Sequence, residues 1–278
     1  KEVAIHDEKQ PYGVFAWLSK DKTKKSANVL SKGHDPKEFE QSTYFLESDL
    51  HVGAKFEAMF QRPLNGDHFL PQRMANIIPF SSGKLPEILK LFSIAPNSFK
   101  AEKMKEVVQA CERPPLLGVK NHCATSLESM VDFVASNLNV TSSMHTVINA
   151  ISPEPENETT SMEAYTVASF TAVAMEATTS IVCHLQPYLY TVYHCHTDQS
   201  VMPYIVRLVR QSDGFTAEAT AMCHHDTTNW DPEFYGLRAL NARPGGASVC
   251  HLLPVGDIAF VPTTSATIAT SNNNLSVQ

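Results

Sequence analysis

Two Cys-His dipeptides open and close the stretch 183–196, which reads CHLQPYLYTVYHCH. Two further dipeptides follow, Cys223-His224 and Cys250-His251, and the spacers between consecutive dipeptides are residues 185–194, 197–222 and 225–249. The chain holds only six cysteines and twelve histidines, so four adjacent pairs are far from chance. The dipeptides therefore predict a metal site, a disulfide framework, or both.

The segments that carry the dipeptides have the composition of β-strands. They are rich in valine, isoleucine, threonine and aromatic residues, and we expect strands over 165–175, 180–196, 204–210, 215–223 and 248–260. Neighbouring side chains of a strand point to opposite faces, so the cysteine and histidine of one dipeptide do not easily bind the same ion. This predicts four sulfurs on one side, able to form two disulfides, and four imidazoles converging on a metal. Four cysteines allow three pairings, and the sequence does not choose among them.

The side chains offered to a metal are imidazoles, without thiolates or carboxylates. Such a site suits copper, nickel or zinc, and copper binds most tightly in the divalent series. The closely spaced Cys-x-x-Cys knuckles of zinc fingers are absent from the sequence. His194 lies two residues from His196 and can reach the same ion, whereas His225 follows His224 and should point away from it. The alternative is that disulfide-forming cysteines merely happen to precede histidines.

Segments before the strands have helical periodicity. They are 85–94, 99–110 and the stretch after Thr125. In the last of these, Thr125 and Glu128 predict a capping box, in which each side chain satisfies a backbone N–H. Cys111 and Cys123 flank the turn between the second and third helices and predict a disulfide that closes a short loop. Buried free thiols are the alternative.

We expect an α+β fold, with N-terminal helices followed by a largely antiparallel β assembly that carries the four dipeptides. The folded domain should cover residues 44–262. Residues 1–43 are polar and rich in lysine, which predicts a flexible leader. The tail 263–278 is rich in serine, threonine and asparagine and should be disordered.

The bulk composition excludes some classes of partner. A net charge of -7 and a pI near 5.9 argue against nucleic-acid binding. No apolar run is long enough to span a bilayer, so no membrane partner is expected. An even number of cysteines fits an oxidising compartment, and glycosylation sequons at Asn139, Asn157 and Asn274 fit the same route. We expect the secretory pathway, with the extracellular space, the cell wall or the vacuole as destination.

One island in the leader departs from its polar composition. Residues 10–17 read QPYGVFAW and hold three aromatic residues, among them one of the two tryptophans of the chain. One interpretation is a hydrophobic anchor that docks on the folded domain. The other is a peptide displayed for chemistry.

The spacing of the four Cys-His dipeptides is similar to the signature of the plant BURP-domain family. The resemblance continues upstream in FLESDL at 45–50, IPFSS at 78–82 and CATSLESM at 123–130, and it extends to residue 262. In this light QPYGVFAW resembles the core peptide of burpitide precursors of the lyciumin or legumenin type, with Gln-Pro first, Gly fourth and Trp last. The chain looks close to the peanut-type cyclases of the unknown-seed-protein subfamily.

The resemblance implies a copper-dependent peptide cyclase that uses molecular oxygen and acts in cis on its own N-terminal core peptide. The implied substrate residues are Gln10, Pro11, Tyr12, Gly13, Val14, Phe15, Ala16 and Trp17. The implied catalytic copper ligands are His184, His196, His224 and His251, with His194 and His225 in reserve for a second ion. The cross-link would join the Trp17 indole to another atom of the octapeptide. By analogy with lyciumins that atom is Gly13 Cα, and the Tyr12 phenol competes with it.

Release of the product would need separate proteases, and a glutaminyl cyclase could then close Gln10 to pyroglutamate. The alternative function is a non-catalytic BURP protein of the cell wall or seed that acts by binding, in which case QPYGVFAW is incidental. A zinc-stabilised binding module is a third hypothesis.

Overall fold

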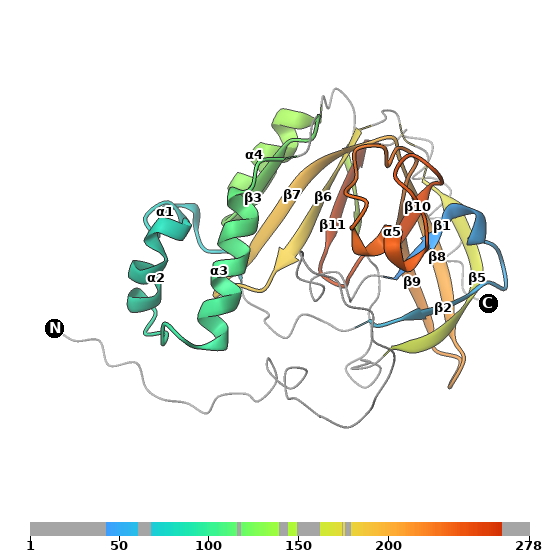
Figure 1. The fold of residues 1–278 in the computed structure, drawn as a ribbon, viewed down its shortest axis with the longest axis horizontal. Helices are drawn as coiled ribbons and strands as arrows, with labels where there is room; N and C mark the ends of the chain where they lie inside the picture. Colours follow the sequence, from blue (N-terminus) through green and yellow to red (C-terminus); the bar gives the residue numbers. More distant parts are fainter. Residues whose placement is uncertain are drawn as a thin grey trace.

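The computed structural model describes residues 43–60, 68–115, 118–138, 144–148, 162–173, 175 and 179–262. Within these ranges the chain forms a mixed α/β fold with two sheets, whose described strand pairs are all antiparallel (Figure 1). The core peptide 10–17, the asparagines of the three sequons and the tail 263–278 lie outside the described residues. The predictions made for them stay predictions.

The first sheet has six strands in the order β1-β10-β9-β8-β5-β2. They are β1 (Tyr44–Leu46), β2 (Lys55–Ala58), β5 (Glu163–Ala172), β8 (Val201–Arg210), β9 (Thr216–His224) and β10 (Val249–Leu252). The hairpin between β8 and β9 turns at Gly214, whose φ of 77° glycine adopts without steric cost. An ion pair between Arg210 and Asp213 spans the same turn.

The second sheet has five strands in the order β3-β7-β6-β11-β4. They are β3 (Asn121–Ala124), β4 (Met144–Ile148), β6 (Thr179–Gln186), β7 (Val192–Gln199) and β11 (Ile258–Pro262). The expected strand 180–196 is therefore two strands, since Pro187 cannot donate to a ladder and the chain turns back after it. The expected strand 248–260 also divides, and its halves β10 and β11 belong to different sheets.

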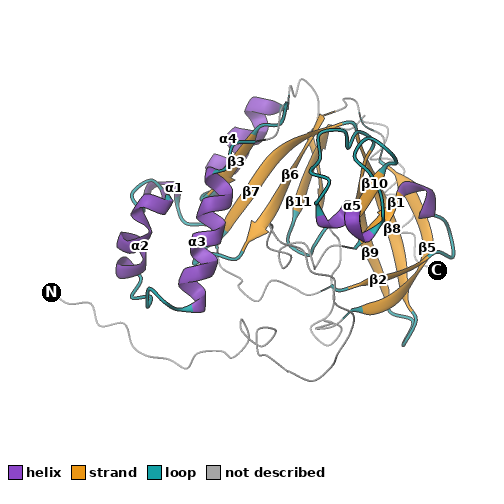
Figure 2. Ribbon diagram, viewed as in Figure 1, coloured by secondary structure: helices purple, strands orange, loops and turns teal. Residues whose placement is uncertain are grey.

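The helices are α1 (Gln72–Ala75), α2 (Leu85–Leu91), α3 (Phe99–Glu112), α4 (Leu127–Asn137) and α5 (Tyr235–Ala239), with 3₁₀ turns at η2 (Glu47–Asp49) and η3 (Ser82–Lys84). Figure 2 shows α3 and α4 beside β3, whereas α5 lies near β1. The expected order, with helices first, needs correction. β1 and β2 precede the helices and pair with the later strands β10 and β5, and α5 falls between β9 and β10.

Serine side chains cap the N-termini of the two longest described helices, α3 and α4. The hydroxyl oxygens of Ser98 and Ser126 accept hydrogen bonds from the backbone N–H groups of Ala101 and Ser129. The N-cap of α4 is thus Ser126 and not the expected Thr125, because the extended backbone that a cap requires falls one residue later. Such a cap is worth about 1 kcal/mol to the helix.

α2, α3 and α4 pack on the five-stranded sheet and on its β6–β7 turn. α4 packs in a cluster that includes Met130, Val134, Ile181, Cys183 and Cys195. α2 and α3 pack on the β6–β7 turn, in a cluster that includes Tyr188, Tyr190 and Val192. A disulfide between Cys111 and Cys123, the pair expected from the sequence, ties α3 to β3.

The face of β6 and β7 opposite α4 turns toward the six-stranded sheet, since Val182 and Ala259 pack against Val201 and Met222.

Candidate metal centre

The cysteines of the four dipeptides form two cross-strand disulfides. Cys183 bonds Cys195 across β6 and β7, and Cys223 bonds Cys250 across β9 and β10. Both bridges join residues that lie directly opposite each other in the antiparallel register, with Cα atoms 3.9 Å apart. Strand register therefore selects one of the three pairings that the sequence left open.

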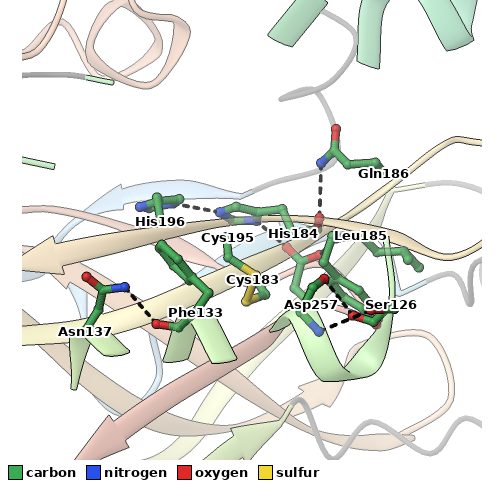
Figure 3. The surroundings of a disulfide bond; sticks show 12 residues. Ser126, Phe133, Asn137, Cys183, His184, Leu185, Gln186, Cys195, His196 and Asp257 are labelled. Atoms are coloured by element: carbon green, nitrogen blue, oxygen red, sulfur yellow. Dashed lines mark hydrogen bonds and ion pairs between the residues drawn. A yellow bond between two sulfur atoms is a disulfide. The ribbon is translucent and has the colours of Figure 1, made fainter. Parts of the chain in front are cut away.

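Alternation sends the histidines of β6 and β7 to the face opposite the sulfurs. His184 is the register partner of His194, and His196 lies diagonally across from His184. Figure 3 shows the imidazoles of His184 and His196 on one side of the strands and the Cys183–Cys195 disulfide on the other. The Nε2 atoms of His184 and His196 are 3.2 Å apart. Nitrogens this close can share one proton or ligate one cation, because two imidazoles bound to one ion at about 2.0–2.1 Å have their nitrogens about 3 Å apart.

The histidines of β9 and β10 form a second pair. The rings of His224 and His251 stack with centroids 5.4 Å apart and planes 13° apart. Both share a face of the sheet with Met222, and Met222 packs on Val182 of the other sheet. The two histidine pairs therefore occupy the same interface between the sheets.

Asp198 links the two pairs. It follows His196 by two residues on β7 and so shares its face. Its Oδ2 lies 3.3 Å from Nδ1 of His224 and 4.0 Å from Nδ1 of His196. Ser200, with a φ of 57°, then carries the chain from β7 into β8 of the other sheet, so Asp198 sits at the corner where the sheets meet. Burial opposes the ionisation of Asp198, but attraction by His224 and His196 outweighs it and lowers the pKa of the carboxyl.

A second carboxylate supports the first pair. Asp257, 3% exposed, places Oδ2 at 2.6 Å from Nδ1 of His184, and its Oδ1 accepts a hydrogen bond of 2.9 Å from the backbone N–H of Leu185 (Figure 3). The Tyr193 hydroxyl donates to the carbonyl oxygen of Gly256 and so holds the turn that carries Asp257. A carboxylate on Nδ1 directs Nε2 of the same imidazole toward the centre.

Three of the imidazoles are neutral at neutral pH. Burial, helped by neighbouring imidazoles, lowers the pKa of His194 to about 4, of His196 to about 4 and of His251 to about 3. Neutral imidazole is the form that binds metals. The side chains of His184 and His196 keep 30% and 26% of their surface exposed, against 9% for His224.

These pKa values predict that acid destabilises the metal-free protein. In the unfolded chain His194, His196 and His251 titrate near 6.5, so between about pH 6.5 and pH 4 the unfolded state binds more protons than the folded state. The free energy of unfolding should therefore fall as the pH falls through this window. Urea unfolding in the presence of a chelator measures it, and an equal midpoint at pH 7 and pH 5 would contradict the assignment.

An aromatic wall, made by Tyr44, Trp230 and Phe234, packs against the second pair. The Trp230 ring lies edge-on to His224 with centroids 5.0 Å apart, and Phe234 lies 5.0 Å from Trp230. The Tyr44 ring lies 5.6 Å from His251. A Cβ atom on Gly236 of α5 would lie 2.7 Å from the Tyr44 ring, so glycine lets α5 approach this closely. The wall gives the second pair an apolar border.

His194 and His225, the two further histidines proposed for a second ion, lie in different places. His194 lies on the histidine face, with its ring centroid 6.4 Å from that of His196, and its buried Nε2 has no hydrogen-bond partner among the described residues. His225 points away, as alternation predicts, and its Nε2 lies 3.0 Å from Oε2 of Glu47. It is therefore not brought together with the four dipeptide histidines.

Sequence reasoning missed both carboxylates and the aromatic wall. Asp198 could have been predicted from the sequence, because a residue two positions after His196 on a strand must lie on the same face as His196. Asp257 could not, since it reaches His184 only through the pairing of β11 with β6.

The residues fit copper by the chemistry of their donors. Across the part of the chain that the structure describes, no three His, Cys, Asp or Glu side chains already surround a common ion position. The interface nevertheless gathers imidazoles, several of them neutral, with two Nε2 atoms face to face and a buried Nε2 on His194 that lacks a described partner. Imidazole-rich sites suit copper, nickel and zinc, and copper most tightly.

Two antiparallel sheets, each stapled by a cross-strand disulfide and meeting at a histidine-rich interface, define the class of this domain. The chain belongs to the BURP domain family of plant proteins, whose model matches residues 43–262. It is 39% identical to BURP domain-containing protein 3 of Oryza sativa subsp. japonica over 219 residues, which cover 78% of this chain and 50% of the relative.

Other relatives are similar at comparable levels. BURP domain protein RD22 of Arabidopsis thaliana is 36% identical over 214 residues, covering 76% of this chain and 53% of the relative. Protein RAFTIN 1A of Triticum aestivum is 30% identical over 236 residues, covering 84% of this chain and 59% of the relative. The chain thus spans about half the length of several curated relatives.

The three disulfides also bear on where the domain folds. Disulfides form and persist in oxidising environments, such as the secretory pathway and the extracellular space. None of the described helices is long and apolar enough to cross a membrane.

Proposed function

We propose that this protein is a copper-dependent oxidative peptide cyclase that acts in cis on its own segment QPYGVFAW, residues 10–17. His184, His196, His224 and His251 would hold the metal, with His194 next to the first pair. The proposal joins two features of one chain: a histidine interface of the kind that suits copper, and an oxidisable octapeptide in the leader.

The observation that carries the proposal is where the leader joins the domain. Tyr44, the first residue after the expected leader, belongs to β1, and its ring lies 5.6 Å from the His251 ring. A flexible linker over residues 18–43 would span about 25–30 Å root-mean-square. Attached beside the histidine interface, such a linker would keep the core peptide at an effective concentration of about millimolar.

The proposed reaction removes two hydrogen atoms. One leaves the indole of Trp17 and one leaves Gly13 Cα, a bond forms between the two atoms, and dioxygen takes up both electrons and both protons as hydrogen peroxide. Copper would supply the one-electron chemistry that couples substrate oxidation to dioxygen. Gly13 suits this role because flanking amides stabilise a radical at its Cα and no side chain blocks approach; the Tyr12 phenol is the competing site.

The residues of the domain have their own tasks in this reaction. Asp257 orients the imidazole of His184 through its Nδ1 atom, and Asp198 lies beside Nδ1 of His224. The aromatic wall offers an apolar surface against which an aromatic substrate side chain can pack. The partly exposed His184–His196 pair lets dioxygen and the peptide approach from solvent. Separate proteases and a glutaminyl cyclase would release and finish the product, and the cell wall or the vacuole is the proposed destination.

Action in cis predicts that cyclisation is independent of protein concentration. The purified chain is loaded with copper in air, digested with trypsin, and the peptide 10–20 is followed as it becomes two hydrogens lighter. We expect one first-order rate constant over a wide dilution series, because the substrate is tethered. A rate constant that rises in proportion to concentration would contradict the proposal, and a sample kept free of dioxygen is the control.

A further inference from the structure

We infer that Asp257 is a positioning residue that fixes the tautomer of His184 and thereby keeps Nε2 of that imidazole available to a metal. The inference rests on the proposed role of His184 as a copper ligand. It starts from two contacts of one buried carboxylate, with His184 and with the backbone of Leu185.

The contact with Asp257 decides which ring nitrogen of His184 carries the proton. Oδ2 of Asp257 lies 2.6 Å from Nδ1 of His184, and an ionised carboxylate can only accept hydrogen bonds. Nδ1 must therefore carry the proton. In a neutral imidazole Nε2 is then left as a lone pair, and this is the atom that faces Nε2 of His196 at 3.2 Å.

The contact with His184 is specific to a carboxylate. Oδ1 of Asp257 already accepts from the backbone N–H of Leu185, which can only donate. In Asp257→Asn this N–H claims the single amide oxygen, so the NH₂ group turns toward His184. Nδ1 must then accept, and the proton moves to Nε2, where it blocks metal binding. An isosteric change of one atom thus reverses the tautomer, as for the aspartate of the serine protease triad.

The fold holds Asp257 in place. The residue is 3% exposed and lies directly before β11, which pairs with β6 so that Ile258 is opposite Cys183. The turn before it places Gly256 at a φ of 99°, and the Tyr193 hydroxyl donates to the Gly256 carbonyl oxygen. The carboxylate therefore cannot turn away to solvent at small cost.

The tautomer of His184 can be measured directly in the metal-free protein. Long-range proton–nitrogen NMR at neutral pH should show His184 with its proton on Nδ1 in the wild type and on Nε2 in Asp257→Asn. Copper(II) affinity, measured by competition with a chelator, should fall by about 10- to 100-fold in the variant, the range for groups that orient metal ligands. Electron paramagnetic resonance should show fewer coordinating nitrogens.

The matched control is Glu47→Gln. Glu47 also contacts an imidazole, His225 at 3.0 Å, but this pair lies outside the histidine interface. Its substitution should leave copper affinity and the His184 tautomer unchanged. Wild-type copper affinity in Asp257→Asn would overturn the inference. A proton on Nε2 of His184 in the wild-type protein would also overturn it. This measurement does not depend on whether the variant folds.

These outcomes are separate from those of the proposed function. Tautomer and affinity are measured without any cyclisation, so a chain that binds copper through an Asp257-oriented His184 but leaves its core peptide linear would refute only the cyclase. Wild-type copper affinity in an Asp257→Asn chain that still cyclises would refute only the positioning role.

Discussion

Replacing His196 with alanine is expected to abolish cyclisation of the core peptide. His196 contributes one of the two Nε2 atoms that face each other at 3.2 Å, and Asp198 approaches its other ring nitrogen. Loss of the ring removes a proposed ligand, which should cost at least the roughly 10- to 100-fold in copper affinity typical of supporting groups. Copper titration and the mass of peptide 10–20 measure both effects.

His225→Ala is the matched control for this change. It removes an imidazole of the same kind from a position that contacts Glu47 and not the histidine interface. The control chain should bind copper and cyclise as the wild type does. Cyclisation of His196→Ala at the wild-type rate, with the fold intact by thermal unfolding, would show that the ligand assignment is wrong.

The second large effect is expected at the substrate. Trp17→Ala removes the indole, the most easily oxidised side chain of the octapeptide, so no two-hydrogen loss should be found in peptide 10–20. Copper affinity should stay at the wild-type value, because residue 17 is not among the proposed ligands. Both variants should leave the core peptide linear, but Trp17→Ala with wild-type copper affinity and His196→Ala with weakened affinity.

A graded control separates the partners of the cross-link. Tyr12→Phe removes the competing phenol and should leave the two-hydrogen loss in place if the link joins Trp17 to Gly13 Cα. Loss of the cross-link in Tyr12→Phe would move the second site from Gly13 to the phenol.

Local patterns in the sequence predicted much of this fold. The period-two alternation around Cys183 and Cys195 correctly separated sulfurs from imidazoles, since that rule acts between neighbours on one strand. Helical spacing also located α2, α3 and α4. Boundaries were harder, because the Ser126 cap and the break at Pro187 depend on backbone conformations that several adjacent residues could adopt.

Long-range pairing was beyond local reasoning. The disulfide partners follow from which strands are neighbours, and β10 and β11, separated by a short loop, join different sheets. Asp257 contacts His184 across 73 positions of sequence. Only the register of β11 against β6 brings that carboxylate to the site.

Tandem mass spectrometry of peptide 10–20, from the full chain loaded with copper in air, decides whether this protein cross-links its own leader. We expect a peptide two hydrogens lighter than its sequence, with no fragmentation between residues 13 and 17. A linear peptide of unchanged mass, from a chain whose histidines demonstrably hold copper, would contradict it and favour a BURP protein that acts by binding.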